Sequence, residues 1–422
     1  MAKRKPEPTG DDTAKYSLSA EFEPAHSGDV KAVLAVDDDL LVSASRDSSV
    51  AVWKLGKERF DLVALLEGHG AYVNSLAYIP PIAEDDNRYI ASGGNSGVIL
   101  VHNLTTLQTT SKACLIGHAL NVCALSYSSK QQKLISGSWD TTARVWSREK
   151  TQCGEGEGQG YGEWKTDVVL EGHEQAVWDV AVVEGSTERQ YLTCSADRLV
   201  NLWDEGGQLL QRFKGSPEPV RSLAILPSND TFVTACNDGL IRLWDFTGSV
   251  LQVLRGHTDY TYRVIVGTDS QLISCGEDHT ARVWHEGEEI DILPHPCQTV
   301  WCVASLPNGD IATGGSDGVV RAWSRASTRI ASADIQKSYR ERLPVIPDRS
   351  ASRAPNLTAA PEAAAPVTMT IDIDLSDEDP PIPLVYSTNV EPRVAAEEFG
   401  HAHNLSDNYI NQIEAFIKAH LS

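Results

Sequence analysis

The side chains of this sequence that most resemble a reactive site are His, Ser or Thr, and Asp residues that recur together. They occur in one order, each time followed by a Trp, in the sets His26–Ser43–Asp47–Trp53, His118–Ser136–Asp140–Trp146, His173–Thr193–Asp197–Trp203 and His257–Ser274–Asp278–Trp284. A hydroxyl nucleophile, an imidazole base and an orienting carboxylate are the parts of a hydrolytic triad. A triad is a single site, whereas this set recurs along the chain. We therefore predict a structural network, in which the Asp accepts from the His ring, the hydroxyl holds that ring and the indole N–H joins them.

Each set is positioned by two short apolar runs that flank a polar turn. The Trp follows the Asp by six residues, as Trp146 follows Asp140 in LISGSWDTTARVW. Similar stretches end at Trp53, Trp203, Trp244, Trp284 and Trp323, and a weaker copy has Ser96 and His102 in the Asp and Trp positions. A unit of about 40 to 45 residues with Gly-His early and Trp late is typical of a WD-repeat propeller blade. The seven copies predict a mainly β fold, a seven-bladed WD-repeat β-propeller.

Three copies depart from the complete set. The fifth has Ser216 where His is expected, the seventh has His295 one residue out of register, and the second lacks both Asp and Trp. We expect these blades to be held mainly by apolar packing. The segment 16–22, YSLSAEF, alternates apolar and polar residues before the first blade. Because an open sheet edge is a liability, we predict that it is the outer strand of the last blade and closes the ring beside residues 317–323.

Composition divides the chain into five parts. We predict a disordered tail at 1–14, the propeller at 15–330, an exit helix at 331–343, a Pro- and Ala-rich linker at 344–366 and a small α+β segment at 367–422. Asp334 is the expected N-cap of the exit helix, with Ile335, Tyr339 and Leu343 on its apolar face. The α+β segment is expected to hold strands at 367–375 and 382–386, a helix at 394–401 and a second helix capped by Ser406 or Asp407. The glycine-rich stretch 151–163 is expected to be a surface loop and not a phosphate loop, because no strand–helix junction follows it.

The net charge is −22, so nucleic acid and anionic membrane surfaces are poor partners. No stretch approaches the ~18 apolar residues of a membrane span, and no secretory signal is visible. The eight cysteines show no zinc-ligand spacing, and several occupy equivalent strands of separate blades, which is typical of core residues. We predict no metal, no cofactor and a cytoplasmic protein, with the nucleus as a further location.

Two stretches outside the repeats carry a family resemblance. They are RIASADIQKSYRERL at 329–343 and TIDIDLSDEDPPIPLVYSTNVEPRVAAEEFGHAHNLSDNYINQIEAFIKAHL at 370–421. The first resembles the exit helix of the phospholipase A-2-activating protein family, and the second resembles the latter half of that family's ubiquitin-binding PFU domain. The blade stretches EQAVWDVAV and HTDYTYRVIV fit the same family. The family's PFU domain begins with a Gly- and Trp-containing region, which 344–366 lacks, so a partial PFU domain is expected. The family's PUL domain is not recognised in the sequence.

The resemblance implies a non-enzymatic ubiquitin-binding receptor or adaptor in ubiquitin-dependent protein catabolism and ubiquitin homeostasis, connected to the proteasome. Its partners would be ubiquitin or ubiquitinated proteins, bound by the propeller face and the PFU-like segment. Binding to a hexameric AAA ATPase segregase depends on the PUL domain and is left open. The alternative is a generic WD-repeat scaffold unrelated to ubiquitin. An enzyme is not favoured, because no isolated nucleophile–base set, metal cluster or lipase-type elbow stands out.

A propeller binds partners at the rim of its central channel, where the turns before each structural Asp meet the starts of the inner strands. The turn positions are Arg46, Asn95, Trp139, Ala196, Asn237, Glu277 and Ser316, and the inner-strand positions are Lys31, Asn74, Cys123, Trp178, Arg221, Tyr262 and Trp301. Exposed aromatic and Arg side chains are the composition of a binding hot spot. The predicted partner-binding residues are Arg46, Tyr72, Trp139, Trp178, Arg221, Tyr260, Tyr262 and Trp301. The alternative is that some of these rings only fill the channel mouth.

Overall fold

The computed structural model describes residues 15–56, 59–82, 85–149, 162–184, 189–345, 368–373, 382–387, 392–402 and 410. The chain divides into two compact units, residues 1–348 and 349–422. The expected tail at 1–14, most of the linker and most of the glycine-rich stretch lie outside the described residues.

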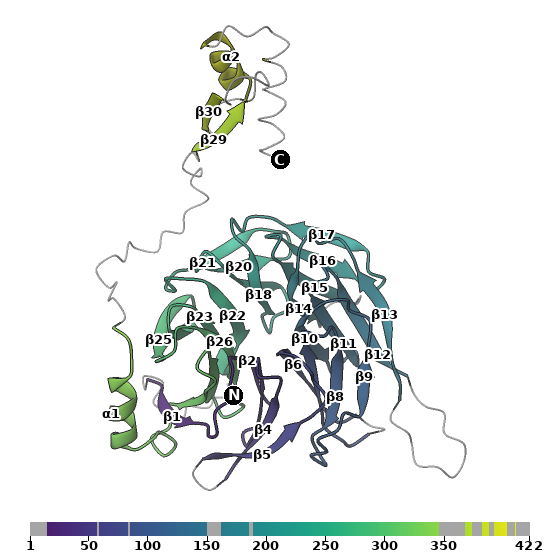
Figure 1. Ribbon diagram of the computed structural model, residues 1–422, viewed down its shortest axis with the longest axis vertical. Helices are drawn as coiled ribbons and strands as arrows, with labels where there is room; N and C mark the ends of the chain where they lie inside the picture. Colours follow the sequence, from purple (N-terminus) through teal and green to yellow (C-terminus); the bar gives the residue numbers. More distant parts are fainter. Residues whose placement is uncertain are drawn as a thin grey trace, which may run out of the picture. The chain divides into compact units, whose positions relative to one another are not determined.

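The first unit is a ring of seven four-stranded antiparallel sheets (Figure 1). From the inner to the outer strand, blades 1 to 4 contain β2 (Val30–Ala35), β3 (Leu40–Ser45), β4 (Val50–Leu55), β5 (Phe60–Leu66); β6 (Val73–Ile79), β7 (Tyr89–Gly94), β8 (Ile99–Asn103), β9 (Ala113–Leu115); β10 (Val122–Ser128), β11 (Lys133–Ser138), β12 (Ala143–Arg148), β13 (Trp164–Leu170); β14 (Val177–Val183), β15 (Gln190–Ser195), β16 (Val200–Asp204), β17 (Leu209–Phe213). Blades 5 to 7 contain β18 (Val220–Ile225), β19 (Thr231–Cys236), β20 (Ile241–Asp245), β21 (Val250–Leu254); β22 (Thr261–Val266), β23 (Leu272–Gly276), β24 (Thr280–His285), β25 (Glu288–Pro294); β26 (Val300–Ser305), β27 (Ile311–Gly315), β28 (Val320–Ser324), β1 (Ser17–Glu21). The predicted seven-bladed propeller is confirmed.

The outer strand of blade 7 comes from the start of the chain. β1 pairs antiparallel with β28, with Leu18 opposite Trp323 and Glu21 opposite Arg321. Leu18 is buried in one core cluster with Trp323. This confirms the predicted closure of the ring, in which the first strand covers an edge that would otherwise be open.

Neighbouring blades pack closely because small residues lie on their second strands. A Cβ on Gly93 of β7 would lie 2.6 Å from Cγ1 of Val122, and one on Gly314 of β27 would lie 2.5 Å from Cγ1 of Val30. Both valines begin the inner strand of the next blade. The absence of a side chain on these glycines therefore lets the sheets approach around the channel, as tight interior packing requires.

Each inner strand contains the same irregularity at its second residue. Pairing with the second strand shifts there in all seven blades. The residues at the shift are Lys31, Asn74, Cys123, Trp178, Arg221, Tyr262 and Trp301. A β-bulge adds one residue to a strand and re-aims its side chain. The repeated bulge thus presents seven different side chains at equivalent places around the channel.

A helix follows the last blade, α1 (Ala333–Glu341), within the predicted 331–343. Its buried side chain is Tyr339, whose hydroxyl donates to the Pro294 carbonyl at 2.8 Å and whose ring lies 5.7 Å from that of Trp323. Two details of the prediction are wrong. The N-cap is Ser332, with Asp334 in the first turn, and Ile335 is 51% exposed. The helix is short and docks through one aromatic residue, so it lacks the continuous apolar stripe expected from a spacing of four.

The second unit contains a hairpin of β29 (Thr368–Ile373) and β30 (Ile382–Ser387), and helix α2 (Pro392–Ala402). These elements coincide with the strands and first helix expected from the sequence. Ala395, Ala396 and Phe399 of α2 are buried, as is Ile410. The rest of the second expected helix, including Ser406 and Asp407, lies outside the described residues. Within the described residues of the whole chain, no helix is long and apolar enough to cross a membrane.

Candidate functional site

The four complete sets are closed hydrogen-bonded chains inside their blades. In blade 3, the indole N–H of Trp146 donates to Ser136 Oγ at 2.8 Å, and Ser136 Oγ lies 2.7 Å from His118 Nε2. His118 Nδ1 lies 2.8 Å from Asp140 Oδ2. Because the Asp140 carboxylate accepts, Nδ1–H donates to it, and Ser136 Oγ bridges the indole N–H and Nε2. Every polar atom of this chain therefore has a hydrogen-bond partner.

Equivalent chains occur in blades 1, 4 and 6. They run through His26, Ser43, Asp47 and Trp53; His173, Thr193, Asp197 and Trp203; and His257, Ser274, Asp278 and Trp284. Burial alone would raise the pKa of Asp140, but hydrogen bonds from His118 and Thr142 outweigh it and hold that pKa well below its usual range. The hydroxyls are buried in these chains, so they do not present a nucleophile to a substrate.

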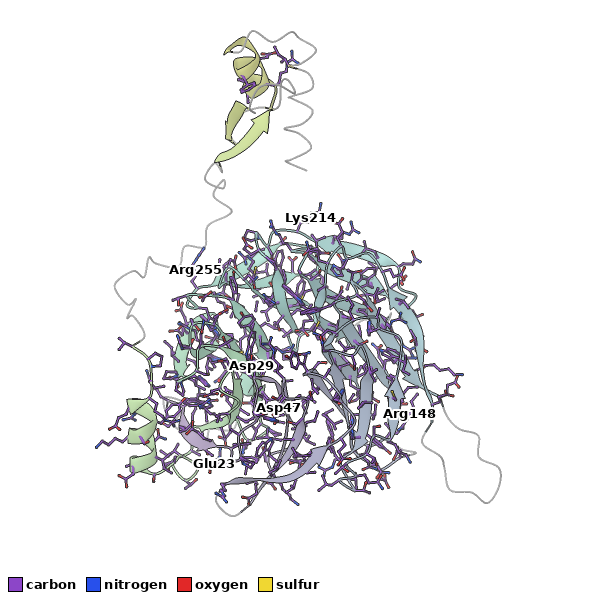
Figure 2. The ribbon with its side chains drawn as sticks, in the orientation of Figure 1. Glu23, Asp29, Asp47, Arg148, Lys214 and Arg255 are labelled. Carbon is purple, nitrogen blue, oxygen red and sulfur yellow. The ribbon has the colours of Figure 1, made fainter. Side chains whose placement is uncertain are left out.

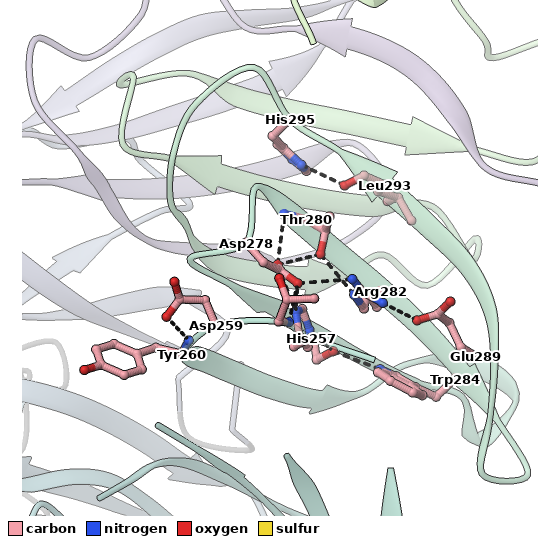
Figure 3. A network of polar contacts seen from close by, with 12 residues as sticks. His257, Asp259, Tyr260, Asp278, Thr280, Arg282, Trp284, Glu289, Leu293 and His295 are labelled. Carbon is pink, nitrogen blue, oxygen red and sulfur yellow. Dashed lines mark hydrogen bonds and ion pairs between the residues drawn. The ribbon is translucent and has the colours of Figure 1, made fainter. Parts of the chain in front are cut away.

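Blade 6 extends its chain with an ion pair (Figure 3). Arg282 Nη2 donates to Asp278 Oδ2 at 3.1 Å, and its Nη1 pairs with Glu289. Asp278 therefore receives both the His257 ring and a guanidinium. Burial opposes ionisation of this carboxylate, but His257 and Arg282 together keep its pKa well below the ordinary value.

Blades 5 and 7 use the same arginine position in place of the missing histidine contact. Asp238 pairs with Arg242 at 2.5 Å, and Asp317 pairs with Arg321 at 2.6 Å. In both blades the indole N–H still donates to a buried threonine hydroxyl, from Trp244 to Thr234 and from Trp323 to Thr313. We expected these blades to be held mainly by apolar packing, and the structure adds a buried polar pair to that packing in each of them. An Arg four residues after the Asp replaces the His as the partner of the carboxylate.

His295 occupies the histidine place in blade 7 despite its shifted position in the sequence. Its Nε2 lies 2.7 Å from Thr313 Oγ1, and its Nδ1 donates to the Leu293 carbonyl at 2.9 Å. A backbone carbonyl thus takes the role that Asp has in other blades. In blade 2, His69 Nε2 lies 2.8 Å from Ser92 Oγ, and His102 Nε2 donates to the Glu67 carbonyl. Polar contacts therefore add to the expected apolar packing of this blade.

A cavity of about 520 Å³ lies at the centre of the propeller. All seven bulged residues line it, together with the predicted residues Arg46, Tyr72 and Trp139. Seven of the eight predicted partner-binding residues are therefore brought together: Arg46, Tyr72, Trp139, Trp178, Arg221, Tyr262 and Trp301. The eighth, Tyr260, is not part of the lining, and its ring stands 6.4 Å from that of Tyr262. We call this cavity and its rim the channel mouth.

Blades 7, 1 and 6 supply a cluster around Trp301. Its indole N–H donates to Asp29 Oδ2 at 3.0 Å, and its ring lies 4.4 Å from that of Tyr262. Lys31 Nζ stands 3.0 Å from the centre of the Trp301 ring, within range of a cation–π interaction. Arg46 Nη1 donates to Asp29 at 3.0 Å (Figure 2 labels Asp29). Burial, and then the charge of Arg46, lower the pKa of Lys31 to about 7.

A second cation–aromatic pair comes from blades 4 and 5. The guanidinium carbon of Arg221 lies 3.8 Å from the centre of the Trp178 ring and 5.2 Å from that of Tyr262. Its Nε donates to Asn237 Oδ1 at 2.7 Å. Stacking on one side and a hydrogen bond at the base hold the guanidinium plane in one orientation.

Blades 2 and 3 make a different, apolar side of the channel mouth. Tyr72 and Trp139 line the cavity and are each 52% exposed, and Leu120, which precedes the lining residue Asn121, is 51% exposed. The side chain of Asn74 donates to that of Asn121 at 2.8 Å between these two blades. Exposed apolar side chains that lie together mark interaction sites, whereas exposed apolar residues that are scattered singly are common on any protein surface.

The prediction of partner-binding residues missed Lys31, Leu120 and Asn121. In each blade, the backbone N–H of the residue before the turn Asp donates to the residue that precedes the inner strand. In blade 3 this acceptor is Asn121, and in blade 2 it is Tyr72. Alignment of the repeats on this position would have found Asn121 and, one residue earlier, Leu120. Lys31 is among the inner-strand positions, but a lone lysine gives no sequence signal that it stacks on an indole.

Comparison with known proteins identifies both parts of the chain. WD domain, G-beta repeats match residues 17–54, 60–103, 109–147, 164–204, 207–245, 248–285 and 287–324, and PFU (PLAA family ubiquitin binding) matches residues 368–422. The chain belongs to the phospholipase A-2-activating protein family of WD-repeat proteins. The repeats and PFU match confirm the resemblance noted in the sequence.

Relatives of this family support the assignment. The chain is 35% identical to ubiquitin homeostasis protein lub1 of Schizosaccharomyces pombe, over 78% of this chain and 42% of that protein. It is 29% identical to the ubiquitin fusion degradation protein 3 homolog of Caenorhabditis elegans, over 96% of this chain and 46% of that protein. The crystal structure of the WD40 propeller domain of Doa1 superposes with a TM-score of 0.65 at 33% identity, covering 75% of this chain and 99% of that domain. The chain spans less than half the length of these two curated relatives.

Proposed function

We propose that this protein is a non-enzymatic ubiquitin-binding receptor or adaptor in ubiquitin-dependent protein turnover. The observation that carries the proposal is the half-exposed Tyr72, Leu120 and Trp139 at the channel mouth of a chain that also matches the PFU domain. Relatives named for ubiquitin homeostasis and ubiquitin fusion degradation support the same role. A cytoplasmic or nuclear location and a connection to the proteasome belong to this proposal, whereas a segregase partner does not form part of it.

The chemistry of the two surfaces is complementary. Ubiquitin offers a small apolar patch rimmed by basic residues. The apolar side of the channel mouth supplies two rings and a leucine, and the chain as a whole carries a net charge of −22. Aromatic anchors contribute most of the affinity of an interface, whereas opposite net charge mainly speeds association.

The non-enzymatic part of the proposal rests on the use of the polar residues. Each Ser or Thr of the His–Asp sets is buried and shared between an indole and an imidazole. Within the described residues there is also no group of three or more His, Cys, Asp or Glu side chains arranged to hold a metal ion. The polar residues that suggest catalysis instead stabilise the blades.

The test is a titration of ¹⁵N-labelled ubiquitin with the full chain and two variants, Trp139→Ala and Tyr72→Ala. Loss of a hot-spot ring costs about 2 kcal/mol, so each variant should bind about 30-fold more weakly. Leu210→Ala is the matched control, since Leu210 is similarly exposed at 49% but lies on the outer strand β17. A chain without residues 349–422 measures the share of binding that belongs to the propeller.

Two outcomes would contradict the proposal in different ways. If the Trp139 and Tyr72 variants bind as the parent does, while removal of 349–422 abolishes binding, the channel mouth is not the ubiquitin site. If the full chain shifts no ubiquitin resonance at high micromolar concentration, the generic WD-repeat scaffold is favoured instead.

A further inference from the structure

The other side of the channel mouth is cationic, although the protein is strongly acidic. Lys31, Arg46, Arg221 and Arg263 line the cavity. Arg46 is paired with Asp29, and Arg263 Nη1 is paired with the buried Asp179 at 2.9 Å. Among the described residues, no salt bridge neutralises Lys31 or Arg221. Two unpaired cations therefore face one cavity in a chain whose net charge is −22.

Packing holds these two cations in place. Lys31 and Arg221 project from the bulges of β2 and β18, and each stands over an indole, Trp301 and Trp178 respectively. The Nε–H of Arg221 donates to Asn237. Its two terminal nitrogens have no hydrogen-bond partner among the described residues. A guanidinium with its two terminal nitrogens available presents a fork that matches a carboxylate.

We propose that this side of the channel mouth binds an extended acidic peptide segment of a partner protein, with an Asp or Glu carboxylate held between Lys31 and Arg221. The walls suit a peptide, because Trp178, Tyr262 and Trp301 offer ring faces to its aliphatic atoms. Nucleic acid is disfavoured, since it would bring many phosphates against a molecule of like charge.

The inference goes beyond ubiquitin binding and does not depend on it. The ubiquitin proposal rests on Tyr72, Leu120 and Trp139, which come from blades 2 and 3, whereas the acidic segment would contact blades 1, 4, 5, 6 and 7. Trp139→Ala should therefore weaken ubiquitin binding but leave binding of the acidic peptide within about twofold of the parent. Failure of one proposal is thus distinguishable from failure of the other.

The experiment measures fluorescence anisotropy of a dye-labelled, N-acetylated, C-amidated hexaglutamate peptide with the full chain. Lys31→Gln and Arg221→Gln should each weaken binding about tenfold, the value of one charge-assisted contact. Lys54→Gln on β4 and Arg340→Gln on α1 remove the same charges from exposed positions and should leave binding unchanged. A hexaglutamine peptide with the same dye should not bind, and melting temperatures of all variants check that they fold.

The pH dependence distinguishes a charge contact from a structural role. The groups that face Lys31 are Arg46, Asp29, Arg221 and the Cys302 thiol, whose pKa burial raises to about 12, and no His lines the cavity. The pKa of Lys31 is about 7, so its charge is present below that pH and is lost above it. Peptide binding should weaken about fivefold from pH 6 to pH 8, while the glutamates, with an ordinary pKa of about 4.3, stay ionised. Lys31→Gln should remove this dependence.

Three results would overturn the proposal. The first is equal binding by the cavity variants and the exposed controls. The second is equal binding of hexaglutamine and hexaglutamate, which would show that charge plays no part. The third is tighter binding of a single-stranded oligothymidylate than of hexaglutamate, with the same dependence on Lys31 and Arg221. That result would assign the cations to nucleic acid.

Discussion

At the scale of residues, the orientation of the His118 imidazole is fixed because both of its nitrogens have hydrogen-bond partners. Nε2 is hydrogen-bonded to Ser136 Oγ, and Nδ1–H donates to Asp140. Removal of either partner would leave a buried polar atom without a hydrogen bond, which costs more than the bond itself contributes.

Asp140→Ala should lower the free energy of unfolding by about 1–3 kcal/mol, because it leaves the His118 Nδ1–H unpaired in the blade. Chemical denaturation of the full chain measures the loss. Asp86→Ala serves as the control, since Asp86 is exposed and should change stability by less than about 0.5 kcal/mol. Equal stability of the two variants would contradict the network.

His295 should make the propeller sensitive to acid. Burial, and then the charge of Arg321, lower its pKa from 6.5 to about 3. The unfolded chain therefore binds a proton below pH 6.5 that the folded state does not, so the stability is fully present above pH 6.5 and falls as pH approaches 3. The expected slope from this one group is about 1.4 kcal/mol per pH unit.

The measurement compares unfolding free energies of the parent and His295→Gln between pH 7 and pH 4. The variant should show a shallower decline, although its stability at pH 7 is also lower. His69, whose pKa burial lowers to about 4, titrates in the same window and remains in both proteins. Parallel pH profiles would show that His295 is not held neutral by the fold.

At the scale of elements, the bulge at the second residue of each inner strand separates the binding surface from the blade core. Val30 and Ala32 pair with β3, while Lys31 between them falls at the shift in register and lines the channel. The same geometry lets seven strands with similar apolar residues present seven different side chains. Changes at these positions alter the channel mouth without altering the ladder of the blade.

β1 is the element on which closure of the ring depends. Leu18→Asp would bury a carboxylate beside Trp323 without a partner, and it should lower the unfolding free energy by about 3 kcal/mol or more. Leu210→Asp is the control, because Leu210 is half-exposed on the outer strand β17. Thermal unfolding compares the two. A normal melting temperature for the Leu18 variant, or for a chain without residues 1–24, would contradict closure by this strand.

At the scale of the whole molecule, the net charge of the chain and the local charge of the channel mouth have opposite signs. The net charge of −22 favours basic partners at long range. The channel mouth reverses that sign locally, because aromatic rings of blades 4, 6 and 7 hold Lys31 and Arg221 inside the cavity. The net charge therefore attracts basic partners, whereas the channel mouth binds an acidic segment.

Much of this architecture could be derived from the sequence alone. The spacing of His, Ser or Thr, Asp and Trp predicted seven blades, because each repeat must satisfy the same buried polar atoms. The alternation in 16–22 predicted the closing strand, and the repeat register placed seven of the eight chosen residues in one cavity. These features are local or periodic, so a linear pattern contains them.

The tertiary structure decided the rest. Only packing shows that Arg242 and Arg321 take the place of a histidine, that His295 reaches Thr313 from a shifted position, and that Ile335 is exposed. Only packing divides the channel mouth into an apolar side and a cationic side, because that division depends on which rings of different blades meet. Contacts between residues distant in sequence set burial and charge environment, and no spacing along one chain records them.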